Sequence, residues 1–124
     1  MRSGPNRRWD RTEHGAGTVL ALGLGMVLLL GFLVIALLAQ AGTLASRAAA
    51  AADLAALAAA DAARGLRDGE PCALASEIAG RNGARVDSCT VTGPEADIVE
   101  VHTGIDGVLG LAHATGRARA GPPP

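Results

Sequence analysis

A run of residues without a single charge, from Gly15 to Ser46, constrains this chain more than any other feature. Its inner part, Thr18–Ala39, has 22 residues and only one polar side chain, that of Thr18. A helix needs about 20 apolar residues to cross the hydrocarbon core of a bilayer. The sequence therefore predicts one membrane-spanning helix over residues 15–41.

The charges on the two sides of this run differ. Four arginines and two acidic residues precede it, whereas seven arginines and ten acidic residues follow it. Positive residues close to a span stay in the cytoplasm. We therefore expect a basic cytoplasmic arm over residues 1–14, an extracytoplasmic domain over residues 42–120 and a disordered tail over residues 121–124. The chain is not basic enough to indicate a nucleic-acid partner.

A cleaved secretion signal is the alternative interpretation of the N-terminus. Ala39-Gln40-Ala41 fits an A-x-A cleavage site, and a basic segment precedes the apolar run. The apolar segment of a signal peptide has about 7–15 residues, and this one is longer. The retained span is the favoured interpretation, and a small secreted protein released after Ala41 is the alternative.

Small residues in the span and leucines after it form the candidate contact faces. Gly17, Ala21 and Gly25 are spaced so that they share one helix face, and such spacing lets two membrane helices approach closely. The alternative is that this spacing only reflects how common Gly and Ala are in the chain. Beyond the span, Arg47–Arg67 has the highest helix propensity, and Leu54 and Leu57 form a short apolar stripe with Ala58.

A second helix is predicted to begin at Pro71, because proline suits the first turn, where its missing N–H has no partner anyway. Asn82-Gly83 ends this helix, since Gly83 tolerates the left-handed backbone of a helix end.

The apolar period then changes from that of a helix to two. Arg85–Thr92 and Asp97–Thr103 are predicted to be strands of a hairpin around Gly93-Pro94. Ile105–Gly110 is predicted to be a loop. Ala112–Ala120 alternates strictly between small and polar residues and indicates a third strand. The expected fold class is α+β: a transmembrane helix that continues as a long alanine-rich helix, a second helix and a three-stranded antiparallel sheet.

Two cysteines, Cys72 and Cys89, both fall in the predicted outer domain. Outside the cytoplasm such a pair usually oxidises. If the inner face of the first strand meets the second helix, the two lie close together. A disulfide closing a loop of this length contributes about 3 kcal/mol in the chain-entropy model. The alternative is a pair of unpaired buried thiols.

No constellation of catalytic or metal-binding residues stands out. The histidines are His14, His102 and His113, and together with the cysteines they lack the close pairs of usual zinc sites. No phosphate-binding loop, G-x-S-x-G or H-E-x-x-H motif occurs. We therefore expect a protein that is not an enzyme and that needs no metal or cofactor.

Two segments resemble a known family. One leads through Gly15-Ala16-Gly17-Thr18-Val19 into the span, and the other is the run AAAADLAALAAA over residues 49–60. Together they resemble the TadE/TadG-type proteins of Flp (tight-adherence) pilus assembly. Within that family the likeness is to the small TadE-like proteins of actinobacteria, encoded among secretion and pilus-assembly genes, whose last strand is similar to RARAGP over residues 117–122.

This resemblance implies a pilin-like fold and a pseudopilin or minor-pilin-like role in the cell membrane, with pilus-assembly or secretion proteins, pilin-like subunits or further copies of the chain as partners. One departure matters. Precursors cut by prepilin peptidase carry Glu at the fifth position after the glycine at the cut, whereas here Leu20 follows Gly15 and Leu22 follows Gly17 at that distance. Cleavage by that peptidase, and polymerisation through that Glu, are therefore not expected.

Overall fold

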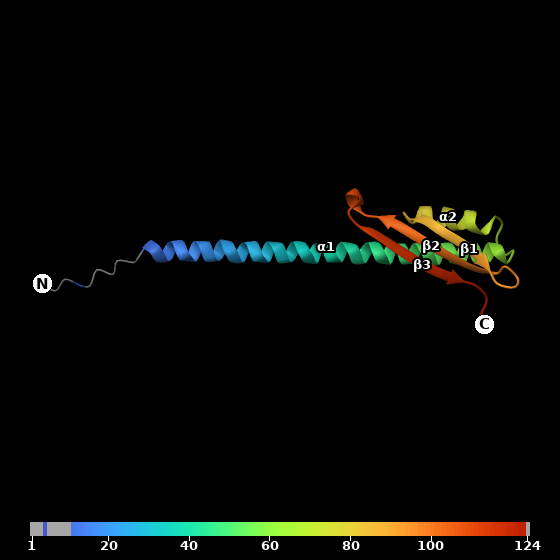
Figure 1. The fold of residues 1–124 in the computed structure, drawn as a ribbon, viewed down its shortest axis with the longest axis horizontal. Helices are drawn as coiled ribbons and strands as arrows, with labels where there is room; N and C mark the ends of the chain where they lie inside the picture. The colour runs from blue at the N-terminus through green and yellow to red at the C-terminus, as the bar shows by residue number, and fades with distance from the viewer. Residues whose placement is uncertain (1–3, 5–10, 124) are drawn as a thin grey trace. The chain divides into compact units, whose positions relative to one another are not determined.

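The computed structural model of the chain describes Gly4 and residues 11–123, with side chains from residue 15 onward. The expectations for residues 1–3, 5–10 and 124 lie outside these residues, whereas residues 11–14 of the predicted arm belong to the first helix. The elements, in chain order, are helix α1 (Arg11–Ala63), helix α2 (Pro71–Arg81), strands β1 (Arg85–Thr92) and β2 (Ile98–Asp106), the short 3-10 helix η1 (Val108–Gly110) and strand β3 (His113–Ala120). The predicted α+β class is confirmed (Figure 1).

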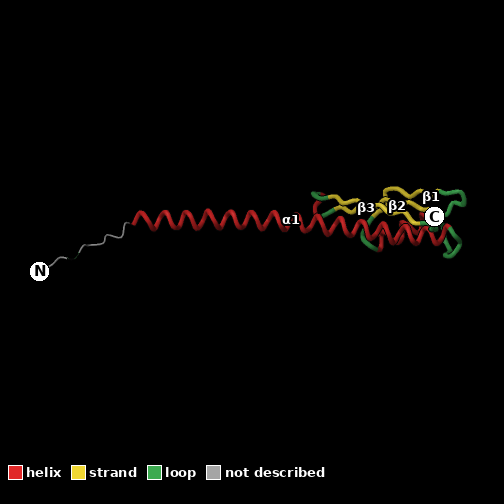
Figure 2. Tube along the Cα trace, turned by 90° about the horizontal axis from the view of Figure 1, so that it is seen from below, coloured by secondary structure: helices red, strands yellow, loops and turns green. Residues whose placement is uncertain are grey.

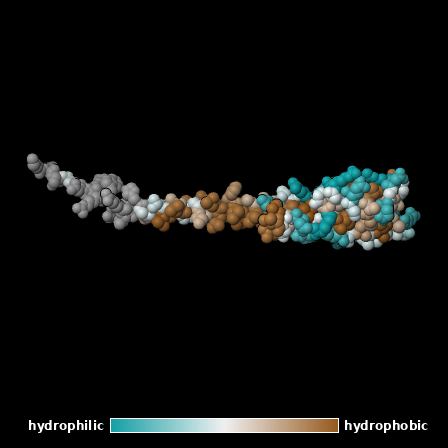
Figure 3. Space-filling model, turned by 90° about the horizontal axis from the view of Figure 1, so that it is seen from above, coloured by the Kyte–Doolittle hydropathy of each residue, from teal (hydrophilic) through white to brown (hydrophobic). Residues whose placement is uncertain are grey.

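Internal contacts divide the chain into two units, Met1–Leu38 and Ala39–Pro124. Helix α1 runs from the first unit into the second. In the first unit, apolar side chains such as Leu20 and Phe32 are more than 70% exposed. Figure 3 shows mostly apolar surface along the N-terminal part of α1 and a mixture of hydrophilic and apolar surface over the second unit. This part of α1 is long and apolar enough to cross a membrane, and near the N-terminus it also suits a signal sequence.

The second unit is a two-layer domain, with both helices on one face of an antiparallel sheet (Figure 2). The strand order is β1-β2-β3, so β2 lies in the centre. Cys89 pairs with Val101 across β1 and β2, and Thr103 pairs with Gly116 across β2 and β3. This is the layout of a pilin-like fold.

The core of this domain consists almost entirely of small side chains. The largest completely buried side chains are those of Val99, Val101 and Thr103 on β2. The rest of the buried cluster is mostly alanine, from α1 (Ala48, Ala51, Ala52, Ala55, Ala56, Ala59, Ala60), α2 (Ala75, Ala79), the α2–β1 turn (Ala84) and β3 (Ala114, Ala118), with Ile105 at the end of β2. Small side chains bury little apolar area each, so the layers must approach closely to exclude water.

The closest approach lies between α1 and the two strands β2 and β3. The Thr103 hydroxyl donates a buried hydrogen bond of 2.7 Å to the carbonyl oxygen of Ala48. Beside it on β3, a Cβ added to Gly116 would overlap that carbonyl and lie 2.7 Å from the backbone nitrogen of Ala49. Gly116 is therefore required by the distance between helix and sheet.

Most predicted boundaries are confirmed. Helix α2 begins at Pro71, and Gly83 follows it at φ +73°. The third strand shows the predicted alternation, with Ala114, Gly116 and Ala118 buried and the residues between them exposed.

Two boundaries differ from the prediction by more than one residue. Helix α1 ends at Ala63, before the end of the helix-favouring segment Arg47–Arg67, because Gly65, the earlier of the two stops that the sequence offers, adopts φ +73° and turns the chain. Strand β2 continues to Asp106 and shortens the predicted loop, because Gly104, Ile105 and Asp106 pair with Thr115, Ala114 and His113.

Candidate functional site

The predicted packing face in the apolar part of α1 has open space beside its glycines within the described residues. A Cβ added to Gly17 or Gly25 would have no atom within 4 Å. Ala21 and Gly25 line a shallow hollow between the longer side chains of Leu22, Met26 and Leu29. The small residues therefore have no packing role within the described chain, and their use as a contact for another helix stays a prediction.

The predicted leucine stripe on the second part of α1 faces away from the core. Leu54 is 48% exposed and Leu57 is 58% exposed, whereas Ala55 is completely buried. Ala58, predicted to share the stripe, is instead 5% exposed and belongs to the buried side. The helix thus turns alanine toward the sheet and leucine toward solvent, the reverse of the usual amphipathic arrangement.

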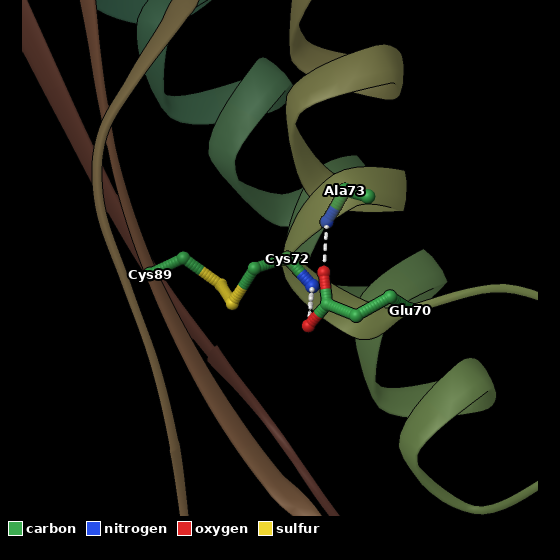
Figure 4. The surroundings of a disulfide bond; sticks show 4 residues. All are labelled: Glu70, Cys72, Ala73 and Cys89. Atoms are coloured by element: carbon green, nitrogen blue, oxygen red, sulfur yellow. Dashed lines mark hydrogen bonds between the residues drawn. A yellow bond between two sulfur atoms is a disulfide. The ribbon is translucent and has the colours of Figure 1, made fainter.

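A disulfide links helix α2 to strand β1. Cys72 and Cys89 are bonded with their Cα atoms 5.8 Å apart, so the predicted pairing is confirmed. Beside it, the Glu70 carboxylate accepts hydrogen bonds from the backbone nitrogens of Cys72 (3.1 Å) and Ala73 (2.7 Å). Figure 4 shows this cap next to the disulfide. The cap satisfies two N–H groups at the start of α2 that have no partner within the helix.

The outer face of the sheet is polar and carries two groups of ion pairs. In the first group, Glu100 contacts the Nε2 atom of His102 at 2.9 Å and a guanidinium nitrogen of Arg117 at 2.7 Å. The hydrogen bond with His102, and then the positive charge of Arg117, lower the pKa of Glu100 below its ordinary value. These contacts join the outer faces of β2 and β3.

The second group lies where β2 ends. Arg85 contacts Asp106 at 2.6 Å and Asp87 at 2.9 Å, and His113 contacts Asp106 at 2.8 Å. The hydrogen bond from His113 and then that from Arg85 lower the pKa of Asp106, and Asp106 in turn raises that of Arg85. This group joins all three strands at one end of the sheet.

The structure does not bring His102 or His113, the two histidines whose side chains it describes, together with the cysteines. His102 contacts Glu100, His113 contacts Asp106, and both cysteines are in the disulfide. The side chain of His14 lies outside the described residues. Among the side chains that are described, no three of His, Cys, Asp and Glu are grouped to hold a metal ion.

Sequence reasoning missed the contact of Ala48 with Thr103 and Gly116. In the sequence, Gly116 only continues the small-residue side of an alternating strand, and Thr103 ends a predicted strand. The alternation was the available signal, because a strand face of Ala and Gly indicates that something packs closely against it. The partner, Ala48, lies 55 residues before Thr103, and nothing in the sequence around Ala48 distinguishes it from the neighbouring alanines.

Comparison with known proteins finds no matching family model, curated protein or solved structure. The likeness to TadE/TadG-type proteins therefore rests on residues 15–19, 49–60 and 117–122 and stays a prediction. What the geometry itself provides is a pilin-like arrangement: an N-terminal apolar helix whose continuation packs on a small antiparallel sheet, with a disulfide.

Proposed function

We propose that this protein is a membrane-anchored pseudopilin or minor-pilin-like component of a Flp/Tad-type pilus assembly or secretion system. In this proposal the N-terminal arm is cytoplasmic, the first part of α1 crosses the cell membrane, and the α+β domain lies outside the cytoplasm. The protein works through protein–protein contacts, and the proposal includes no catalytic step and no cofactor.

The continuity of α1 is the observation that carries this proposal. One helix from Arg11 to Ala63 supplies both the exposed apolar stretch and the alanine face of the domain core. An apolar helix with no protein cover is stable when lipid surrounds it, because all its backbone groups are paired internally. The domain is thereby coupled to the membrane by its own core helix, which is the mechanical arrangement that an anchored assembly subunit needs.

The uncovered faces of α1 favour contacts with other proteins. Leu54 and Leu57 each expose about half of their side chains, although buried alanines lie beside them. Within the span, Gly17, Ala21 and Gly25 leave room for a second helix to approach. A partner helix or a further copy of the chain would bury both faces.

Substitutions on these faces test the proposed contacts. We expect Leu57→Asp, and separately Gly25→Leu, to remove co-purifying membrane partners from detergent extracts without changing disulfide formation. Leu66→Asp is a matched control, because Leu66 is 69% exposed and lies outside α1. Unchanged co-purification with both variants would show that this contact assignment is wrong.

The sequence limits the type of assembly role. Leu20 and Leu22 stand where the glutamate of prepilin-peptidase substrates would be. A filament held by that glutamate and a neighbour's amino terminus is therefore not part of the proposal. The proposed role is that of an assembly component that stays attached to the membrane.

Release as a small secreted effector or binding module is the second candidate. The boundary between the two units supports it, because it falls between Leu38 and Ala39, close to the possible cleavage site after Ala41. A domain beginning at Gly42 would keep every alanine of the α1 core. A mature protein beginning at Gly42 would establish this candidate and exclude the first.

A further inference from the structure

We infer that the turn between β2 and β3 inserts its apolar side chains into the interface of the bilayer that holds α1. The inference rests on the proposed function, since it requires that α1 stays in the membrane. It concerns three residues, Val108, Leu109 and Leu111, which we call the apolar tip. The occupant that we propose for this surface is phospholipid.

The apolar tip is unusually exposed for its composition. Val108 is 80% exposed, Leu109 87% and Leu111 86%. Leu20, the most exposed large apolar residue elsewhere in the described part of the chain, reaches 75%, although it lies in the uncovered apolar stretch of α1. Three such side chains within four positions indicate a surface that is covered by something outside the chain.

The backbone of the tip adds a second, independent observation. Leu109 adopts φ 61° and ψ 15°, a left-handed conformation that disfavours side chains with a Cβ. The turn is closed by hydrogen bonds from Gly107 N to Ala112 O (2.7 Å) and from Gly110 N to Gly107 O (3.1 Å). The chain therefore holds a leucine in strained backbone without burying it, and strain of this kind is concentrated at functional sites.

The position of the tip along α1 identifies lipid as its partner. A Cβ on Gly107 would lie 3.0 Å from the Cδ1 atom of Leu44, and Thr103 contacts Ala48, so β2 runs toward the end of the domain where α1 enters it. Leu44 follows Ala39, the last residue of the apolar stretch, by five residues, which is about 7.5 Å along a helix. The interfacial layer of a bilayer is about 5–8 Å thick on each side.

The two ends of the sheet differ in polarity, as expected if only the end near Leu44 meets the bilayer. The tip projects at the end near Leu44, and the β1–β2 turn lies at the opposite end of the domain (Figure 1). That turn contains Glu95 and Asp97 and no large apolar residue. At the base of the tip, Asp106 pairs with Arg85 and His113. The Asp106 carboxylate is therefore not an unpaired negative charge beside the phospholipid headgroups.

Tryptophan scanning of the full chain in vesicles tests the inference. The chain has one tryptophan, Trp9, so a Trp9→Phe background leaves only the introduced residue. We would compare Leu109→Trp with Glu95→Trp, a matched exposed position on the opposite turn, in phosphatidylcholine vesicles with and without lipids that carry bromine near the headgroup. Leu111→Trp is the second tip probe, and disulfide formation by intact mass verifies folding of each variant.

We expect blue-shifted emission and strong quenching by the brominated lipid at positions 109 and 111, and neither at position 95. Flotation with the vesicles reports separately on the anchor. If the chain floats but the tip probes are neither shifted nor quenched, or are quenched no more than Trp at position 95, the inference is overturned and the proposed function stands. If tip emission shifts only with protein concentration, the partner is protein and the inference is overturned. A folded chain that does not float overturns the anchor itself.

Discussion

The two parts of α1 reach stability by opposite means. The first part exposes large side chains such as Leu20 and Phe32, whereas the second part buries alanines such as Ala48 and Ala55 against the sheet. In the proposed membrane anchor, large side chains suit fluid lipid, because each one adds apolar area without any need for precise fit. Small side chains suit a helix whose partner is a backbone at close distance. The difference shows that hydrophobicity alone does not identify the core of this protein.

The largest difference between the two parts is expected from one substitution made in each. Gly116→Ala puts a Cβ onto the carbonyl of Ala48 and should destabilise the domain by about 3 kcal/mol or more, because the helix has to move away from the sheet. Gly23→Ala, where a Cβ meets nothing within 4 Å, should leave the domain unaffected. Urea unfolding in detergent micelles, followed by far-UV circular dichroism, measures both. Equal stability of the two variants would refute the close contact.

The disulfide should matter only for the alanine-cored domain. It closes a loop between positions 17 residues apart, and its removal in a Cys72→Ala, Cys89→Ala double variant should cost about 3 kcal/mol in the chain-entropy model. Proteolysis of the variant in micelles should release fragments of the domain and spare the apolar part of α1. Resistance equal to that of the native protein would mean that the small core suffices without the covalent link.

The hydrogen bond between Thr103 and Ala48 should contribute less. Thr103→Val keeps the shape of the side chain and removes the donor, so we expect a loss of about 1 kcal/mol. Thr90→Val, an exposed position on β1, is the control and should change stability little. Urea midpoints of the two variants provide the comparison, and a loss that is equal for both would show that the buried bond has no special weight.

The ion pairs on the outer sheet face should have the smallest effect. The folded-state pKa values of Glu100 and Asp106 lie below their ordinary values of 4.5 and 3.8, so both groups stabilise the domain above those values. This contribution is lost as the pH falls through the lowered folded-state pKa values. Glu100→Gln should flatten the fall in stability below pH 4.5, as measured by urea unfolding at stepped pH. An unchanged pH profile would contradict the assigned pKa shift.

The elements themselves were predictable from local signals. The apolar run, Pro71 and Gly83 at the ends of α2, and the alternation over residues 112–120 each specify an element through backbone preference or period. The end of β2 was not predictable, because Gly104 and Asp106 favour a loop locally and are held in the strand by pairing with Thr115 and His113. Cross-strand partners decide there, and they are distant in sequence.

The contact faces were predicted less well than the elements. The helical period groups Leu54 and Leu57 with Ala58, but in the structure the two leucines are exposed and Ala58 is buried. The reason is that the helix approaches the sheet so closely that only alanine fits between them. The tip at residues 108–111 was predicted only as part of a loop. Its exposed apolar character becomes informative only when the position of the turn beside Leu44 is known.

The intact mass and cellular location of the native protein, measured with and without reduction and thiol alkylation, test the central claim most directly. The claim is that one retained helix is both membrane anchor and domain core. It predicts a full-length mass in the membrane fraction, with both cysteines protected from alkylation until reduction. A mass beginning at Gly42 in the culture fluid would contradict it and establish the secreted protein instead.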